Sequence, residues 1–348
     1  MAVHHAGVSV VICCYNSSSR LPETLAHLAK QKFSNLSIPW EVIIMDNGST
    51  DNTAAFALSE WQKYKMPAPL YVITEPRPGT AIARESGIQK SKYEFVLFCD
   101  DDNWLIDSYV ENVYNIMTSN AEIAALGGQG EAVCEVQPPA WFEQFKAYYA
   151  IGPQAGRDNP SKVSLERGFL YTAGSTFRKS VIEDLENTGF KSVLEGRTGK
   201  NLAGGEDVEL CYNIILNGGH IYYDSRLLFK HYMTKPRLNW PYYKRMIRAF
   251  GKGYSLLMPY KLLLNKQEKR FKMGIKWLYL SAFYLIFRTL FIDMPKSLFD
   301  NQFLAARANL ESHIGFLESL LTNHNAVVNL YKKLESAPWI VEEYRVTR

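Results

Sequence analysis

Three consecutive carboxylates, Asp100, Asp101 and Asp102, directly follow an apolar run at 93–99. The run predicts a short buried strand, and such a strand would place the aspartates at the rim of a sheet, where open α/β folds bind their ligands. Two carboxylates separated by one residue can share Mg²⁺ or Mn²⁺, whose other positions stay free for water or phosphate oxygens. The spacing predicts a metal and diphosphate site. The alternative is a solvated acidic turn that caps a helix starting near Asp107.

A second acidic group stands far along the chain, in Gly204-Gly205-Glu206-Asp207. The residues that follow it have the pattern of a helix that ends near Asn217. Acidic side chains in a first turn are favoured by the helix dipole, which would be a purely structural explanation. The paired glycines let a ligand approach closely and favour a binding site instead. His231, directly after a strand-like run, is a candidate imidazole ligand for a metal ion.

The N-terminal part of the chain alternates between strand and helix patterns. We predict strands at 8–14, 40–45, 70–74 and 93–99, helices between them at 20–32, 52–65 and 80–90, and a further helix at 107–120. This order is typical of βαβ units and predicts an α/β fold of the Rossmann type, with a mostly parallel sheet flanked by helices. Polar turn residues follow successive strands, and ligand sites in such sheets are assembled from these carboxyl ends.

The pattern is less regular between 121 and 240. The segment 138–162 is rich in aromatic residues, Pro and Gly, which predicts a loop or cover over a site. Within it, Trp141 either lines a pocket or fills the core. A helix at about 178–187 and short strands at 220–223 and 227–230 complete this region.

Five motifs occur in an order that resembles the family 2 glycosyltransferases of the GT-A fold. They are Val10-Val11-Ile12-Cys13-Cys14-Tyr15-Asn16, Asp46-Asn47-Gly48-Ser49-Thr50-Asp51, Asp100-Asp101-Asp102, Gly205-Glu206-Asp207 and His231. The resemblance covers roughly residues 8–250, and the combination is more specific than any one motif. It implies an inverting enzyme that moves a sugar from a nucleotide-diphosphate donor to an acceptor hydroxyl, with Mg²⁺ or Mn²⁺ as cofactor.

The resemblance also implies roles for individual residues. The nucleotide-sugar would be bound by Cys14, Tyr15, Asn16, Asp46, Gly79, Arg84, Asp100 and Asp101, with Asp46 accepting from a base N–H. Asp102 would be the direct metal ligand, Asp100 would hold ribose or the metal, and His231 would be the distal metal or diphosphate contact. Asp207 would be the general base with Glu206 beside it, and the acceptor side would include Trp141, Gly174 and Gly205.

The chemistry of glycosyl transfer agrees with these roles. A nucleoside diphosphate leaves poorly until a cation neutralises the charge that develops on its phosphates. A single displacement then needs one carboxylate to take the acceptor's proton, and a helix N-terminus can project Asp207 for that purpose. The chain departs from the commonest family pattern in two places. Cys13-Cys14 stands where Pro-Thr is frequent and Asn47 where a second Asp is frequent, which leaves UDP or GDP open as the nucleotide.

Composition sets the broad class. The chain has 348 residues, 47% of them hydrophobic, which is enough for one large domain or one domain with an appendage. A formal charge of +4 without a Lys/Arg block predicts no nucleic-acid partner. Five cysteines without a Cys-x-x-Cys spacing, and no apolar leader in residues 1–7, predict a cytoplasmic protein with reduced thiols.

We expect a GT-A catalytic domain at 1–240, with a nucleotide-binding half at about 8–105 and an acceptor half at about 106–240, and a helical extension at 241–348. Ten Lys and Arg residues lie between 242 and 276, and the segment 277–287 is uncharged and strongly apolar. This run is too short to span a bilayer, and Arg288 interrupts it.

We therefore expect peripheral contact with the cytoplasmic face of a membrane through 261–292, which would suit a lipid-linked acceptor. The alternative is a helix buried against the catalytic domain. A helix expected at 300–334 would pack on this tail or mediate a homodimer.

The leading hypothesis is a metal-dependent glycosyltransferase of cell-surface polysaccharide or glycolipid assembly, with a glycan or lipid-linked acceptor. The first alternative is a nucleotidyltransferase that makes a sugar nucleotide. Residues 15–20 are not the Gly-rich, basic loop with which such enzymes hold a triphosphate. The second alternative is an inactive scaffold that binds nucleotide-sugars at the membrane. The presence of all the expected acidic residues argues against it.

Overall fold

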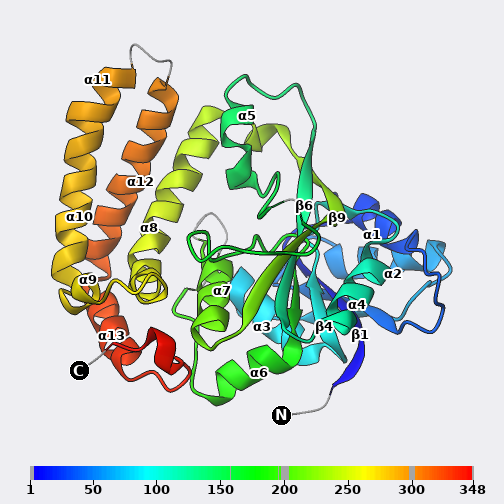
Figure 1. The fold of residues 1–348 in the computed structure, drawn as a ribbon. Helices are drawn as coiled ribbons and strands as arrows, with labels where there is room; N and C mark the ends of the chain where they lie inside the picture. The colour runs from blue at the N-terminus through cyan, green and yellow to red at the C-terminus, as the bar shows by residue number, and fades with distance from the viewer. Residues whose placement is uncertain (1–3, 157, 195, 197–203, 298–301, 347–348) are drawn as a thin grey trace.

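The computed structural model describes residues 4–156, 158–194, 196, 204–297 and 302–346, and they form one sheet with helices on both faces (Figure 1). The nine strands of the described residues follow the order β3-β2-β1-β4-β8-β6-β9-β5, with β7 paired to β9. The predicted α/β class is confirmed. The β3-β2-β1-β4 part and the β6–β9 pair are parallel, whereas β8, β5 and β7 pair antiparallel with their neighbours.

The parallel part of the sheet is built from the alternating strands and helices that the sequence predicts. Its elements are β1 (His5–Cys14), α1 (Leu21–Ala29), β2 (Trp40–Asp46), α2 (Thr53–Lys63), β3 (Leu70–Thr74), α3 (Thr80–Lys90) and β4 (Tyr93–Phe98). Cys14 pairs with Asp46 and Asp46 with Thr74, so the strand ends lie level with one another. The chain order reverses between β1 and β4, which makes their carboxyl ends the point where open α/β sheets bind ligands.

Alternate residues of the strands serve two separate hydrophobic cores. Val10 and Ile12 pack with residues of α1, α2 and α4 (Tyr109–Ser119), whereas Val11 packs with residues of α3, α6 (Lys179–Asn187) and α7 (Glu206–Leu216). Continuous apolar runs are needed because both faces of these strands are covered.

The strand β6 (Ile123–Cys134) lies where the sequence predicts no strand. Its glycines interrupt the apolar pattern of a strand, but neighbouring backbone leaves no room for a side chain at these positions. A Cβ on Gly128 would lie 2.3 Å from the Leu227 carbonyl oxygen, and one on Gly130 would lie 2.3 Å from the Ala150 carbonyl oxygen. Glycine inside a strand often marks such a close approach.

The strand β9 (His220–Met233) replaces the two short strands predicted at 220–223 and 227–230. The polar residues between them do not end the strand, because the pairing with β6 continues after an irregularity from Gly127↔Tyr223 to Gln129↔Leu228. The smaller elements of this half are β5 (Asn103–Leu105), α5 (Phe142–Phe145), η1 (Lys146–Tyr149), β7 (Ser161–Lys162), β8 (Thr176–Arg178) and η2 (Lys235–Arg237).

The C-terminal region is helical, as predicted, and α8, α12 and α10 run beside one another at the side of the sheet domain (Figure 1). It comprises α8 (Trp240–Leu264), α9 (Glu268–Lys272), α10 (Ile275–Arg288), the π-helical η3 (Thr289–Asp293), α11 (Met294–Ser297), α12 (Phe303–Thr322), α13 (His324–Glu335) and η4 (Glu342–Tyr344). Two helices separated at Asn323 replace the single helix expected at 300–334.

The predicted domain division at residue 240 stays a prediction, since one hydrophobic core continues across it. Leu257 of α8 and Phe316 of α12 belong to the same buried cluster as Ile214 of α7. The Trp339 indole also donates to the Asn213 side chain over 2.8 Å. The extension therefore supports the helix that carries Asp207.

Two glycines let α8 and α12 approach until their backbones touch. A Cβ on Gly251 would lie 2.1 Å from the Ser312 carbonyl oxygen, and one on Gly315 would lie 2.1 Å from the Arg248 carbonyl oxygen. Both contacts are with backbone, which cannot move aside as a side chain can. The sequence contains these glycines, but only the crossing of the two helices gives them a function.

Substituting Gly315→Ala is expected to lower the free energy of unfolding by about 1–3 kcal/mol, the usual cost of overpacking. Alanine favours a helix over glycine by about 0.8–1 kcal/mol, which acts in the opposite direction. A net loss of stability would therefore come from the steric contact. Urea denaturation measures it. The control is Gly156→Ala, whose Cβ would meet only the Ser161 hydroxyl, at 3.5 Å. Unchanged stability of the Gly315 variant would contradict the close crossing.

Candidate active site

The loops after β1, β2 and β3 are joined by side-chain hydrogen bonds into one surface beside the strand ends. The side-chain oxygen of Asn16 accepts from the Thr50 backbone amide at 2.8 Å, and the Asp46 carboxylate accepts from the Ser49 backbone amide at 3.1 Å. Tyr15, predicted at the nucleotide, is 51% exposed beside them. Cys14 is instead buried in the core, so its side chain cannot reach a ligand in this structure.

Asn47 explains one departure from the family pattern. Its amide nitrogen donates to the carbonyl oxygens of Glu75 at 3.0 Å and Arg77 at 2.6 Å, and its oxygen accepts from the Gly79 amide at 2.9 Å. An aspartate could accept but not donate, so it would lose two of these bonds. Gly79 has φ +137°, which favours glycine, and it is the N-cap residue directly before α3. These contacts fix the entry to the helix that carries Arg84.

Asp102 faces two basic groups across the β5–β9 pair. Pairing of Asn103 with His231 brings the two segments together. One Asp102 oxygen accepts from Arg237 at 2.7 Å, and the other lies 3.3 Å from Nε2 of His231. Burial alone would raise the pKa of Asp102, but His231 and Arg237 outweigh it and hold the pKa below its ordinary value. Asp102 is thus ionised and directed at positive charge.

The donor set at Asp102 and His231 suits a divalent cation. Nδ1 of His231 lies 2.8 Å from the Tyr149 carbonyl oxygen, which can only accept, so Nδ1 carries the proton. A divalent cation bound between Nε2 and the Asp102 carboxylate would take the place of a proton on Nε2, and both groups would then act as its ligands. No group of three or more His, Cys, Asp or Glu that could hold a metal occurs among the described residues. Mg²⁺ in phosphate sites often has only one or two carboxylate ligands, with phosphates completing the shell.

Asp101 points to a different part of the molecule from Asp102. Its carboxylate accepts from Arg20 at 2.6 Å and 3.1 Å and from the Ser17 hydroxyl, and its carbonyl oxygen accepts from Thr24. Burial raises the pKa of Asp101, and Arg20 acts against that. Since both oxygens are engaged inside the protein, we assign Asp101 to fastening the aspartate turn to α1, in place of the nucleotide contact expected from the sequence.

Arg84 of α3 links the aspartate turn to the acidic start of α7. Its guanidinium lies 2.7 Å from Glu206 and 3.7 Å from Asp100. The Thr80 hydroxyl donates to the same Glu206 oxygen at 3.1 Å. The other Glu206 oxygen is buried and has no partner within the described residues. Glu206 therefore positions Arg84, and through it the two acidic motifs become parts of one constellation.

Asp207 lies beside this pair, in the first turn of α7 after Gly205, whose φ of +115° favours glycine. Burial raises the pKa of the Asp207 carboxyl, and the charge of Glu206 raises it further, while Arg84 opposes both. A carboxylate whose pKa is shifted upwards is a stronger base, as proton abstraction from a hydroxyl requires.

Two residues predicted on the acceptor side make packing contacts in the structure. Trp141 is partly buried and contacts the rings of Tyr243 and Trp240 at centroid distances of 5.4 Å and 5.6 Å, so it packs against the core, while its predicted place on the acceptor side stays a prediction. Gly174 accepts from the Tyr109 hydroxyl at 2.5 Å, and a Cβ there would lie 2.7 Å from the Phe229 ring. These contacts explain why a small residue is needed at 174.

Arg237 was not assigned a role from the sequence. It stands six residues after His231, among other basic residues, and a cation near an aspartate motif is what recognition of a diphosphate requires. That signal could have identified it.

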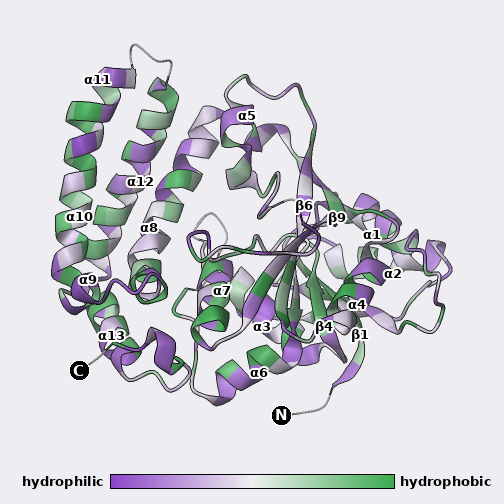
Figure 2. Cartoon of the chain, in the orientation of Figure 1, coloured by the Kyte–Doolittle hydropathy of each residue, from purple (hydrophilic) through white to green (hydrophobic). Residues whose placement is uncertain are grey.

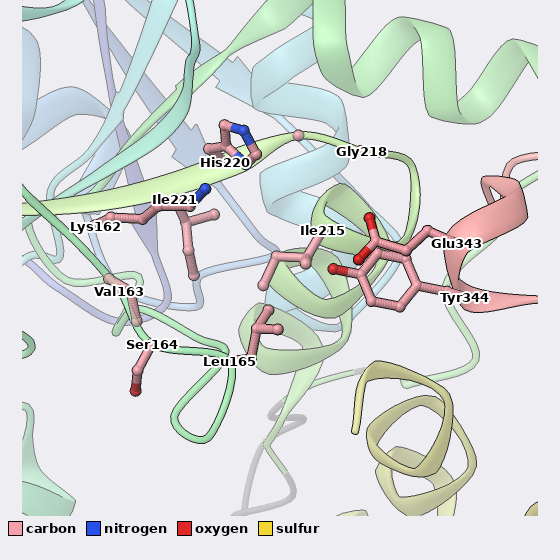
Figure 3. Close-up of a pocket in the computed structure, with 11 residues that line it drawn as sticks. Lys162, Val163, Ser164, Leu165, Ile215, Gly218, His220, Ile221, Glu343 and Tyr344 are labelled. Atoms are coloured by element: carbon pink, nitrogen blue, oxygen red, sulfur yellow. The ribbon is translucent and has the colours of Figure 1, made fainter. Parts of the chain in front are cut away.

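The cavity drawn in Figure 3, of about 500 Å³, lies elsewhere, between the start of β9, the 162–165 segment and η4. None of the acidic residues discussed above lines it.

The model of the family described as "Glycosyl transferase family 2" matches residues 9–185, about half of the chain. The chain belongs to the family 2 glycosyltransferases. It is 27% identical over 184 residues to the poly(ribitol-phosphate) beta-N-acetylglucosaminyltransferase TarP of Staphylococcus aureus, which covers 51% of this chain and 50% of that protein. It is 30% identical over 107 residues to the glycosyltransferase GlyG of Streptococcus pneumoniae, with 31% and 34% covered. The alignments span half or less of these relatives.

Solved structures with the same fold include residues 1–349 of S. aureus TarS, with a TM-score of 0.51, 18% identity, and coverage of 94% of this chain and 89% of that one. The TarS complex with UDP-GlcNAc matches with a TM-score of 0.51, 17% identity, and coverage of 91% and 92%. At this identity the likeness shows the GT-A-like fold, including the helical C-terminal region, and nothing about the substrate.

Proposed function

We propose that this chain transfers a sugar from a nucleotide-diphosphate donor, first of all a UDP-sugar, to an acceptor hydroxyl with inversion, assisted by Mg²⁺ or Mn²⁺. The observation that carries the proposal is the Arg84 bridge, which joins the Asp100–Asp102 turn to Glu206 and places Asp207 beside it. UDP is favoured because TarS, which shares the fold, is known in complex with UDP and with UDP-GlcNAc.

The residues of the site would divide the work between the two ends of the donor. Asp102 and His231 would hold the cation, which supplies charge to neutralise the leaving diphosphate. Arg237 lies where it can add a second positive charge to the same phosphates. The exposed Tyr15 and the loop after β2 would bind the nucleotide base.

Asp207 would act on the opposite side of the reacting carbon. As the acceptor oxygen forms its bond to the anomeric carbon, Asp207 takes the hydroxyl proton, and the electron pair of the breaking carbon–oxygen bond leaves with the diphosphate. One displacement with one base inverts the configuration. The partly buried Arg84–Glu206 pair fixes the start of α7 so that Asp207 is held in position.

The acceptor that we propose is a cell-surface polysaccharide or a lipid-linked glycan, handled on the cytoplasmic side of the membrane. Support comes from the names of relatives, which include TarP and a poly-beta-1,6-N-acetyl-D-glucosamine synthase of Staphylococcus epidermidis that is 27% identical over 122 residues. The nucleotidyltransferase alternative is weakened, since Arg20, the cation in the loop after β1, is already paired with Asp101.

We expect the chain to bind UDP-GlcNAc or another UDP-sugar with Mn²⁺ present and to hydrolyse it slowly to UDP when no acceptor is present. Calorimetric titration with a panel of UDP- and GDP-sugars measures binding, and detection of released nucleotide measures hydrolysis. A nucleotidyltransferase would instead release pyrophosphate from a nucleoside triphosphate and a sugar phosphate. That result, or failure to bind every sugar nucleotide tested, would contradict the proposal.

A further inference from the structure

The helix α10 and its continuation η3 expose an apolar stripe to solvent. Seven large apolar side chains on it are between 40% and 66% exposed: Leu280, Phe283, Tyr284, Phe287, Leu290, Phe291 and Ile292. Their separations of three and four residues place most of them on one helix face. The opposite face, with Leu278, Ala282 and Thr289, is buried against the protein. Figure 2 shows hydrophobic colour along α10, the outermost of these helices.

Basic residues surround this stripe. Exposed Lys269, Arg270, Lys272 and Lys276 lie at its N-terminal end, and exposed Arg288 and Lys296 lie towards its C-terminal end. The same segment, 268–297, has two acidic residues, Glu268 and Asp293, paired with Lys272 at 2.8 Å and Arg288 at 3.5 Å. Six basic residues against two acidic ones leave a local excess of positive charge around exposed aromatic rings, the combination that anionic lipid surfaces attract.

The stripe is suited to lying on a membrane and not to crossing one. The helical segment 275–297 is long and apolar enough to span a membrane, and only 17% of its apolar 18-residue stretch is buried. Behind α10, however, lies α12, whose Glu311 and Glu318 form ion pairs with Lys244 and Arg248 of α8. Insertion of α10 across the bilayer would either bring these ion pairs into the hydrocarbon or separate α10 from α12. Both events cost free energy.

A second copy of the chain is a poorer occupant of the stripe. A two-fold dimer through α10 would align the two helices either parallel or antiparallel. In the parallel case each basic N-terminal end would meet its equivalent. In the antiparallel case it would meet the end that carries Arg288 and Lys296. Positive charge opposes positive charge in both arrangements, whereas anionic headgroups complement it.

We propose that the apolar face of α10 and η3 inserts into the interface of an anionic membrane, with the basic residues around it contacting lipid phosphates. The inference does not depend on the proposed function, because vesicle binding is measured without donor or acceptor. It gives the protein a defined orientation, with α12, α8 and then the sheet domain successively further from the lipid (Figure 1).

The test is co-sedimentation of the full chain with vesicles of phosphatidylcholine alone and of phosphatidylcholine mixed with phosphatidylglycerol. We expect binding to the mixed vesicles that weakens with salt. The double variant Phe283→Ser/Phe287→Ser should bind them at least tenfold more weakly, a rough expectation from the apolar area lost. Lys269→Glu/Lys276→Glu should also weaken binding, through charge.

The matched control is Leu36→Ser/Tyr71→Ser, which removes two exposed apolar side chains far from α10 and should leave binding unchanged. All these positions are exposed, so circular dichroism and thermal unfolding should show intact folds. If the chain binds neither kind of vesicle, or binds both kinds equally, the proposal is overturned. A dimer that the phenylalanine substitutions dissociate while vesicle binding stays the same would overturn it as well.

Discussion

Substituting Asp207→Asn is expected to reduce sugar transfer by about 10²–10⁴-fold, the usual contribution of a general base, with donor affinity almost unchanged. Asparagine has the same shape, and its oxygen can still accept from the Val208 amide, which now contacts the carboxylate at 2.9 Å. It cannot accept the acceptor's proton. Rates of transfer together with calorimetric donor binding would separate loss of chemistry from loss of binding.

The pH dependence provides a second readout of the same residue. A base works when deprotonated, and burial raises the pKa of Asp207 above the ordinary value of an aspartate, so activity should be lost as pH falls through that raised pKa. This limb should lie at higher pH than an exposed aspartate would give, and the residual activity of the Asn variant should lack it. The neighbouring variant Glu206→Gln is the control, because it keeps the base while it weakens the contacts with Arg84 and Thr80. Since the charge of Glu206 helps to raise the pKa of Asp207, its removal should move the acid limb to lower pH but should not abolish it. A larger loss in Glu206→Gln than in Asp207→Asn would contradict the assignment of the base.

Substituting Asp102→Asn is expected to weaken donor binding in Mn²⁺ by at least about tenfold, since even outer partners of metal ligands contribute 10–100-fold. A chelator should weaken binding to the wild type by a similar factor and should have little further effect on the variant. Such non-additive losses identify a shared interaction between the residue and the ion. Calorimetric titration with and without the chelator measures all four affinities.

Asp101→Asn is the matched control for this experiment. It alters the adjacent carboxylate, which pairs with Arg20 and not with His231, so the variant should melt at a lower temperature yet keep its sensitivity to the chelator. Equal donor binding by the wild type in Mn²⁺ and in chelator would show that donor binding needs no divalent cation. The metal assignment of Asp102 and His231 would then be withdrawn.

The bounds of the first four strands could be predicted to within a few residues because the pattern that marks each strand lies within its own sequence. Val8 to Cys14 and Trp40 to Met45 are apolar runs ended by turn residues, and β1 and β2 cover them. The strand β6 was missed for the opposite reason. Gly127, Gly128 and Gly130 weaken any local preference for a strand, and only contacts with residues far along the chain make glycine necessary there.

The amino-acid sequence by itself determined the order of the first four strands and the helices between them, the acidic motifs and the family, since each depends on residues close together in the chain. Only the tertiary structure decided the partners of those motifs. Asp102 meets Arg237 across 135 residues, Glu206 meets Arg84 across 122, and Asp101 meets Arg20 across 81. It also decided that α10 buries one face and exposes the other. Local periodicity specifies an element, but the order of strands in the sheet and the crossing of helices determine which charges meet.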